Sequence, residues 1–245
     1  MPTVLVTGSS RGIGRAIAEA LRARGVAVIG HATRAADADT IAADLSDPIG
    51  PQLLWQQAME RGSGRIDALV NNAGVFAANA LDSSDIAWLD AWEDTLRINL
   101  TATAQLSRFA VRHWLEAGTP DNAIRGRLVH IASRAGHRGD SPEHWHYAAS
   151  KGGMLALHKT IARAYAAKGV LSFAIAPGFT DTAPKDSGAG DYLASRGGDS
   201  LLADIPLGRV ATPEEVARIA AFCTLDAPPS MTGAVIDANG ASYVR

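Results

Sequence analysis

Short runs rich in β-branched residues alternate along this chain with longer segments of helical periodicity. The apolar runs are TVLVT (3–7), VAVIG (26–30), IDALVNN (66–72), GRLVHIAS (126–133), VLSFAIAP (170–177) and GAVIDANG (233–240). Candidates for amphipathic helices between them are 14–24, 86–116, 148–168 and 213–225. A repeated order of strand, helix and strand predicts a parallel sheet that is covered by helices on both faces. We therefore expect an α/β fold.

The pattern predicts a single domain over residues 1–245, because no linker, repeat or low-complexity tract divides the chain. Gly25 stands where a left-handed cap would end the first helix, and Thr212 followed by Pro213 predicts the start of the last one. Two connections are unusual. Residues 31–47 leave little room for a helix before a short third strand near 40–44, and residues 179–205 are long enough to form a lid.

The composition and charge of the chain limit the kinds of partner that we expect it to bind. Apolar residues make up 47% of the chain and charged residues 20%, which predicts a globular core. The net charge is −2 with both signs scattered, so we expect a small-molecule partner and neither nucleic acid nor a membrane surface. Cys223 is the only cysteine, which favours a reducing compartment. No membrane-spanning apolar run occurs and the first strand begins at once, so we expect a cytoplasmic protein.

A glycine-rich turn, TGSSRGIG, follows the first strand and leads directly into a helix. Glycines there let the backbone turn tightly and approach a pyrophosphate, whose charge would be met by free amides at the helix N-terminus. The spacing is G-x-x-x-G-x-G rather than the G-x-G-x-x-G of the classical dinucleotide fingerprint. In this context the turn predicts a nucleotide site that includes Gly8, Ser10, Arg11, Gly12, Ile13 and Gly14.

Tyr147 and Lys151 lie four positions apart in YAASK. On a helix such residues share a face, and the small residues between them leave room for a ligand. A phenol titrates near pH 10 in water, so it is a poor proton donor or acceptor at neutral pH. A nearby ammonium group favours the phenolate and lowers the pKa of the tyrosine. We therefore interpret Lys151 as the residue that tunes Tyr147 for acid–base chemistry.

Several motifs together resemble the classical short-chain dehydrogenase/reductase family. They are TGSSRGIG, NNAG at 71–74, Asn99 in RINL, Ser133 in HIAS, YAASK, and Pro177-Gly178, and they follow the family's order from Thr7 to Gly240. The resemblance implies a doubly wound Rossmann-like sheet of roughly seven parallel strands flanked by helices. It also implies a nicotinamide cofactor and the interconversion of a ketone or aldehyde with an alcohol. In general terms it extends to the 3-oxoacyl-carrier-protein reductases of that family.

The resemblance implies a role for each motif residue. Tyr147 would be the general acid/base, Lys151 would also bind the nicotinamide ribose, Ser133 would hold the substrate oxygen, and Asn99 would support a water-linked proton path behind Lys151. The remaining cofactor contacts that it implies are Asp44 and Leu45 at the adenine, Asn71, Ala73 and Gly74 along the adenosine and ribose, Pro177 and Gly178 beside the nicotinamide, and Thr180 or Thr182 near the carboxamide or the phosphates.

The end of the second strand bears on the choice of cofactor. It reads His31-Ala32-Thr33-Arg34 and has no carboxylate before Asp37. An acidic side chain there would accept the ribose 2′-hydroxyl of NAD, whereas a 2′-phosphate calls for a cation. Arg34, next to Thr33, and Arg11 in the glycine turn are candidate phosphate ligands. We favour NADP(H) over NAD(H), although the short crossover leaves open whether Arg34 or Asp37 faces the ribose.

The sequence says less about the substrate than about the cofactor. Residues 134–146, RAGHRGDSPEHWH, lie between two candidate catalytic residues and are a candidate pocket lining. His144 and His146 are two positions apart and would not share a helical face, so we expect no metal site. Apolar residues in the lid segment, such as Phe179 and Leu201, favour a moderately apolar substrate.

Two other functions are compatible with such a fold. A non-catalytic nucleotide-binding sensor or scaffold would be expected to lose part of the Ser, Tyr, Lys and Asn set, all of which is present. An epimerase or dehydratase without net redox chemistry would normally carry an added substrate domain, and none is visible. The family resemblance further implies a homotetramer or homodimer built on the helices within 86–116 and 148–168.

Overall fold

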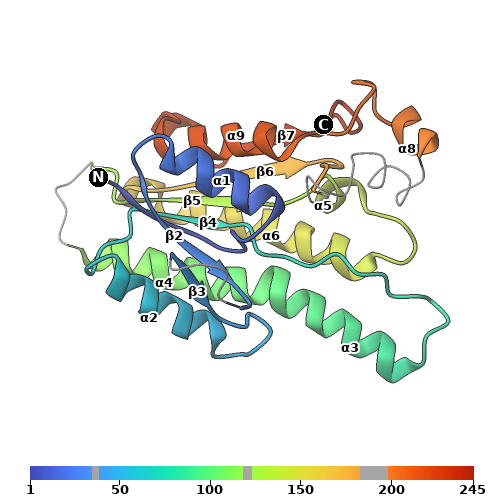
Figure 1. Cartoon of the computed structure of the whole chain (residues 1–245), viewed down its shortest axis with the longest axis horizontal. Helices are drawn as coiled ribbons and strands as arrows, with labels where there is room; N and C mark the ends of the chain where they lie inside the picture. The colour runs from blue at the N-terminus through green and yellow to red at the C-terminus, as the bar shows by residue number, and fades with distance from the viewer. Residues whose placement is uncertain (35–38, 118–122, 183–197) are drawn as a thin grey trace.

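The described residues fold around a parallel sheet. The computed structural model describes residues 1–34, 39–117, 123–182 and 198–245. The sheet has seven strands in the order β3-β2-β1-β4-β5-β6-β7, and every neighbouring pair is parallel (Figure 1). The strands are β1 (Thr3–Val6), β2 (Ala27–Ala32), β3 (Thr40–Ala42), β4 (Ala68–Asn71), β5 (Gly126–Ile131), β6 (Val170–Pro177) and β7 (Val235–Ala238). The expected α/β fold is therefore confirmed.

Helices cover both faces of this sheet (Figure 1). On one face lie α1 (Gly12–Arg22) and α9 (Pro213–Leu225), and on the other lie α2 (Gly50–Arg61), α4 (Ala102–Glu116) and α6 (Trp145–Tyr165). The shorter or peripheral segments are α3 (Asp85–Leu96), the π-helical turn η1 (Arg97–Thr101), α5 (Ala135–Arg138), η2 (Ala166–Lys168), α8 (Asp199–Ala203) and η4 (Pro229–Met231). The direction of winding reverses between β1 and β4, so the carboxyl ends of these strands border a crevice where ligands bind in such sheets.

Three elements differ from the sequence-based expectation. The helix expected over 86–116 is divided, because α3 continues through the π-helical turn η1 into α4. Helix α2 was not predicted, since its Gly50-Pro51 start is typical of a turn and polar residues interrupt its apolar pattern. Strand β3 ends at Ala42, two residues earlier than the expected 40–44. Of the predicted lid, residues 183–197 lie outside the described part of the chain, and the remainder contains α8.

Both predicted helix signals are confirmed. Gly25 has a φ of 74°, the left-handed conformation that glycine adopts without steric cost. At the start of α9, the Thr212 hydroxyl accepts a hydrogen bond from the Glu215 amide, and the Glu215 carboxylate accepts one from the Thr212 amide. Arg209 also donates to this carboxylate, and together these bonds lower the pKa of Glu215 to about 2.

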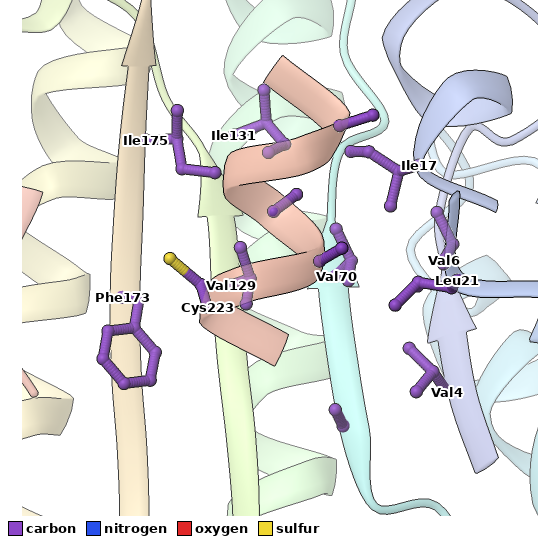
Figure 2. Close-up of a cluster of buried hydrophobic side chains, with 14 of the residues drawn as sticks. Val4, Val6, Ile17, Leu21, Val70, Val129, Ile131, Phe173, Ile175 and Cys223 are labelled. Atoms are coloured by element: carbon purple, nitrogen blue, oxygen red, sulfur yellow. The ribbon is translucent and has the colours of Figure 1, made fainter. Parts of the chain in front are cut away.

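The core on the α1 and α9 face is formed by apolar side chains from the strands and both helices. Val4, Val70 and Phe173 are fully buried there, together with Cys223 of α9 (Figure 2). Burying side chains of this size contributes roughly 1.5–3 kcal/mol each. Burial also raises the pKa of Cys223 to about 11, so this free thiol stays protonated and unreactive at neutral pH. None of the described helices has the length and apolar character needed to cross a bilayer.

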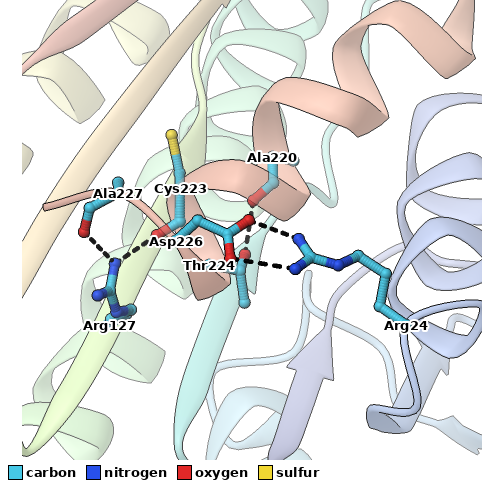
Figure 3. A network of polar contacts seen from close by, with 7 residues as sticks. All are labelled: Arg24, Arg127, Ala220, Cys223, Thr224, Asp226 and Ala227. Carbon is cyan, nitrogen blue, oxygen red and sulfur yellow. Dashed lines mark hydrogen bonds and ion pairs between the residues drawn. The ribbon is translucent and has the colours of Figure 1, made fainter.

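Arg127 of β5 ties the sheet to the end of α9. Its guanidinium donates to the carbonyl oxygens of Cys223 and Ala227, at 3.1 and 2.9 Å, which satisfies acceptors that a helix end leaves unpaired (Figure 3). The neighbouring Asp226 instead pairs with Arg24 at an exposed site.

We expect Arg127→Met to lower the free energy of unfolding by about 2–4 kcal/mol, because two buried carbonyl groups lose their donor. Arg24→Met is the matched control. It removes only the exposed ion pair with Asp226 and should cost much less, because water and salt screen an exposed ion pair. Urea denaturation followed by circular dichroism would measure both. Equal losses in the two variants would contradict the assigned role of Arg127.

Candidate active site

The glycine turn joins β1 to α1 at the carboxyl edge of the sheet. Gly8 and Gly12 have positive φ angles of 64° and 53°. A Cβ atom at Gly14 would overlap the Gly8 carbonyl oxygen and the Asn72 side chain, so only glycine fits there. No described side chain caps the first turn of α1, and that turn contains no acidic residue. The uncapped backbone amides of this turn, and the close approach of the backbone that its glycines allow, fit a dinucleotide pyrophosphate. We call residues 8–14 the nucleotide cradle.

The turn is held in place by Asn72, which the sequence analysis did not single out. Asn72 Nδ2 donates to the carbonyl oxygens of Thr7 and Gly8, at 2.8 and 3.1 Å. The Thr7 hydroxyl oxygen in return accepts from the amides of Asn72 and Ala73, both at 2.9 Å. The second asparagine of the NNAG motif was the available signal for this contact.

His31 is a second residue that sequence reasoning missed. Its Nδ1 accepts a hydrogen bond from the Gly8 amide at 3.0 Å, so the ring proton is on Nε2, which donates to the Ala43 carbonyl at 3.0 Å. Burial lowers the pKa of His31 and keeps the ring neutral, as this arrangement requires. The imidazole therefore links the glycine turn to the residues after β3.

The proposed adenosine contacts occupy different environments. Thr33 and Arg34 follow β2 and are exposed, as is Arg11, while Asp37 lies in 35–38, outside the described residues. The Asp44 carboxylate accepts from the amide and hydroxyl of Ser46, and these bonds lower its pKa. Leu45 is buried in the apolar cluster beneath α2.

Asn71 does not point toward the crevice. Its Nδ2 donates to the Ser107 hydroxyl at 3.1 Å and lies 3.3 Å from His130 Nδ1, inside the layer between the sheet and α4. Side chains alternate between the two faces of a strand, and this residue ends β4 facing the interior. Its neighbours Ala73 and Gly74 leave the strand toward the crevice.

A cavity of about 520 Å³ opens at this edge of the sheet. Nine of the sequence-predicted residues line it: Ile13, Gly74, Ser133, Tyr147, Lys151, Pro177, Gly178, Thr180 and Thr182. Thr182 also lies against the glycine turn, because a Cβ atom at Gly12 would be 3.2 Å from its methyl group. The structure therefore brings the candidate catalytic residues and the proposed nicotinamide contacts to one place.

Lys151 is buried one helical turn after Tyr147 on α6. Its ammonium group donates to the Ile131 carbonyl at 2.8 Å and lies 5.8 Å from the centre of the Tyr147 ring. The two side chains thus share a face, as the spacing predicted. Burial lowers the pKa of Lys151 to about 8. The bond to Ile131 explains how a lysine is held at the end of β5.

Asn99 lies behind this pair, in the π-helical turn η1. Its Oδ1 accepts from the Val75 amide at 2.8 Å, while its Nδ2 donates to the Val75 carbonyl and to the Ser150 hydroxyl, at 3.0 and 3.1 Å. A Cβ atom at Gly74 would be 3.2 Å from Asn99 Oδ1 and 3.6 Å from Lys151 Nζ, so these groups meet across that glycine. A π-helical turn at such a residue is typical of functional sites.

Aromatic packing orients Tyr147. Phe76 contacts the Tyr147 ring edge-on, with 4.7 Å between ring centres, and His144 stacks on Phe76 at 3.9 Å. Ser133, two residues after β5, has its Oγ 3.1 Å from the Ala135 amide, from which it accepts a hydrogen bond. Phe76 lies two residues after the NNAG motif, and the sequence carried no signal for its contact with Tyr147.

Only part of the segment 134–146 lines the cavity. Its pocket-lining residues are Arg134, Ala135, Arg138, Gly139, Asp140 and Ser141. His137 instead stacks on Tyr243, and Trp145 contacts Trp88. Among the residues with described positions, no group of histidine, cysteine and acidic side chains is arranged to hold a metal ion.

We expect Gly14→Ala to weaken NADPH binding by at least roughly tenfold, because the added methyl group displaces the Gly8 carbonyl and Asn72. Ala20→Gly is the control, since it destabilises the same helix by about 1 kcal/mol without touching the turn. Titration of NADPH fluorescence would measure both affinities. Comparable weakening in the two variants would show that general helix stability, not the cradle, controls binding.

The lowered pKa of Lys151 predicts a pH-dependent stability. Between pH 8 and 10.5 the unfolded chain keeps the Lys151 proton and the folded protein has lost it, so folding stability rises with pH across that window. Relative to Lys151→Met, the free energy of unfolding of the wild type should gain about 3 kcal/mol over this range. Urea denaturation at several pH values would test this. A difference that does not change with pH would contradict it.

The chain is similar to known proteins over nearly its whole length. A family model described as enoyl-(acyl carrier protein) reductase matches residues 8–240. The 3-oxoacyl-[acyl-carrier-protein] reductase FabG of Escherichia coli (strain K12) is 33% identical over 251 aligned positions, which cover 98% of this chain and 96% of that protein. Nodulation protein G of Rhizobium sp. (strain N33) is 33% identical over 247 positions, with 96% and 94% covered. The chain therefore belongs to the short-chain dehydrogenase/reductase family and is an NAD(P)-dependent oxidoreductase that acts on CH–OH groups.

Proposed function

We propose that the protein interconverts a ketone or aldehyde and the corresponding alcohol, with Ser133, Tyr147 and Lys151 as catalytic residues and Asn99 in support. The observation that carries the proposal is the convergence of the first three side chains on one cavity, with the Asn99 carboxamide behind them. Bound NADPH supplies the hydride that reaches the carbonyl carbon. NADP(H) is the favoured cofactor.

The protein's own groups deliver the proton. In reduction, the Ser133 hydroxyl donates a hydrogen bond to the carbonyl oxygen and holds it near Tyr147. The Tyr147 hydroxyl then transfers its proton to that oxygen as negative charge develops on it. The Lys151 ammonium stabilises the phenolate that is left, because a cation near a phenolate lowers its free energy. In alcohol oxidation the same groups act in the opposite direction.

Three features support NADP(H). Arg34 is exposed just after β2, where a ribose 2′-phosphate would meet a cation, and Arg11 is exposed in the glycine turn. No carboxylate occupies residues 31–34 at that end. Asp44, the first acidic residue after β3, already has its carboxylate engaged by Ser46.

The rival functions have less support. A nucleotide sensor would not need a buried lysine beside a tyrosine and a serine in the same cavity. An epimerase or dehydratase is disfavoured because relatives that cover nearly the whole chain are named reductases.

We further infer a homotetramer or homodimer in the cytoplasm. Helix α3 exposes Ile86 and Leu89, and Trp88 stacks on Trp92 beside them, which supports contact with a second copy along this helix. The only cysteine, Cys223, is a buried free thiol, which supports a reducing compartment.

We expect Tyr147→Phe to lower kcat for ketone reduction by at least roughly 100-fold while NADPH affinity stays within a few-fold, because the phenylalanine ring keeps the packing against Phe76 but has no proton to donate. Tyr165→Phe, on the same helix, is the control and should leave both quantities unchanged. The measurement is the loss of NADPH absorbance with a panel of ketones and aldehydes. Full turnover by Tyr147→Phe would contradict the role of Tyr147 as general acid/base. If the wild type reduced no carbonyl compound at all, the sensor and epimerase alternatives would again have to be considered.

A further inference from the structure

Arg134 places a positive charge inside the cavity, directly after the candidate catalytic Ser133. The residue is only 6% exposed and lines the cavity. Its amide donates to the Pro177 carbonyl at 3.0 Å, and its guanidinium lies 4.6 Å over the Phe179 ring. The side chain is therefore held against the segment that follows β6.

Arg138 brings a second positive charge to the same wall. Its amide donates to the Arg134 carbonyl at 3.1 Å, which closes one helical turn at α5. Residues four positions apart share a helical face, and both arginines line the cavity. An anion bound between them would be attracted by both charges.

The charges of the described lining have a positive excess. Arg134, Arg138 and Lys151 are basic, whereas Asp140 and Asp204 are the acidic residues, and both of these are exposed. A guanidinium cannot lose its proton under ordinary conditions, so Arg134 keeps its charge although it is buried. Phe179 packs against one face of this planar group, and the N–H donors of a guanidinium lie in its plane, in the fork geometry that pairs with a carboxylate.

We propose that the substrate is an oxo acid, a carbonyl compound that carries a carboxylate close to the reacting carbon, and that Arg134 binds this carboxylate with Arg138 at the outer rim. Ser133, the residue proposed to hold the carbonyl oxygen, and Arg134 line the same cavity, so one small substrate can contact both. This inference rests on the proposed function and names its substrate class. It differs from the neutral thioester end that a 3-oxoacyl carrier substrate would present.

The test compares oxo acids with their methyl esters, which have the same carbon skeleton and no charge. Wild-type protein should reduce 2-oxo or 3-oxo acids with a kcat/KM roughly 10- to 100-fold above that of the esters. Arg134→Gln should remove most of this preference by raising KM for the acid, and it should leave kcat/KM for the ester within a few-fold. Arg134→Lys should keep part of the preference, because it retains the charge but not the planar fork.

Two variants serve as controls. Arg138→Gln should lower the preference less than Arg134→Gln does, and Arg163→Gln, on α6 and outside the cavity lining, should not change it. NADPH affinity, measured by fluorescence, reports whether each variant is folded and competent. If Arg134→Gln does not fold, the acid-to-ester ratio of the wild type and of Arg138→Gln still decides the question.

Esters or coenzyme A thioesters that are reduced as well as the acids would overturn the proposal, as would equal losses for acid and ester in Arg134→Gln. Both results leave a working carbonyl reductase and so concern the substrate class alone. A wild type that reduces none of these compounds, nor any in the wider carbonyl panel, would instead refute the proposed function on which the inference rests.

Discussion

The site depends on the contact between the two halves of the sheet, where the end of β1 lies beside the end of β4. Four hydrogen bonds connect Thr7 and Gly8, at the end of β1, with Asn72 and Ala73, at the end of β4. The winding direction reverses between these strands, and the four bonds continue the β1–β4 pairing beyond the last residues of the ladder. The glycine turn extends from one partner and Gly74 from the other. The same four hydrogen bonds therefore fix the position of the glycine turn relative to Gly74, which lies beside Lys151.

A second feature of the molecule is how many ionisable groups it keeps in the interior. Burial lowers the pKa of His130 to about 3 and that of His158 to about 4, so both rings are neutral. They pack between the sheet and α6, where His158 contacts the Ser172 hydroxyl at 2.8 Å. Lys151 lies near this polar layer and is the one among them whose pKa is close to neutral pH. Burial of its ammonium group therefore costs stability below pH 8, where the folded protein keeps the charge.

The side of the cavity that we propose for the substrate is built differently from the side that we propose for the cofactor. The cofactor side consists mainly of backbone and small residues, at which larger side chains would collide with the turn. The other side is formed by larger groups, among them Phe76, Arg134, Phe179 and Leu201. The close backbone approach restricts the first surface to small residues, whereas charge and shape on the second can change without disturbing the sheet.

The sequence by itself determined the parallel sheet, the glycine turn and the Tyr147–Lys151 pair, because each follows from local periodicity or from spacing within one element. It did not reveal which way Asn71 points, the locking roles of Asn72 and His31, or the π-helical turn that presents Asn99. Those depend on contacts between segments distant along the chain, such as Gly8 with His31 and Asn99 with Val75. The convergence of Arg134 with Phe179 likewise arises only when β5 and β6 pair. Local pattern thus decided the elements, and packing between them decided which side chains meet in the cavity.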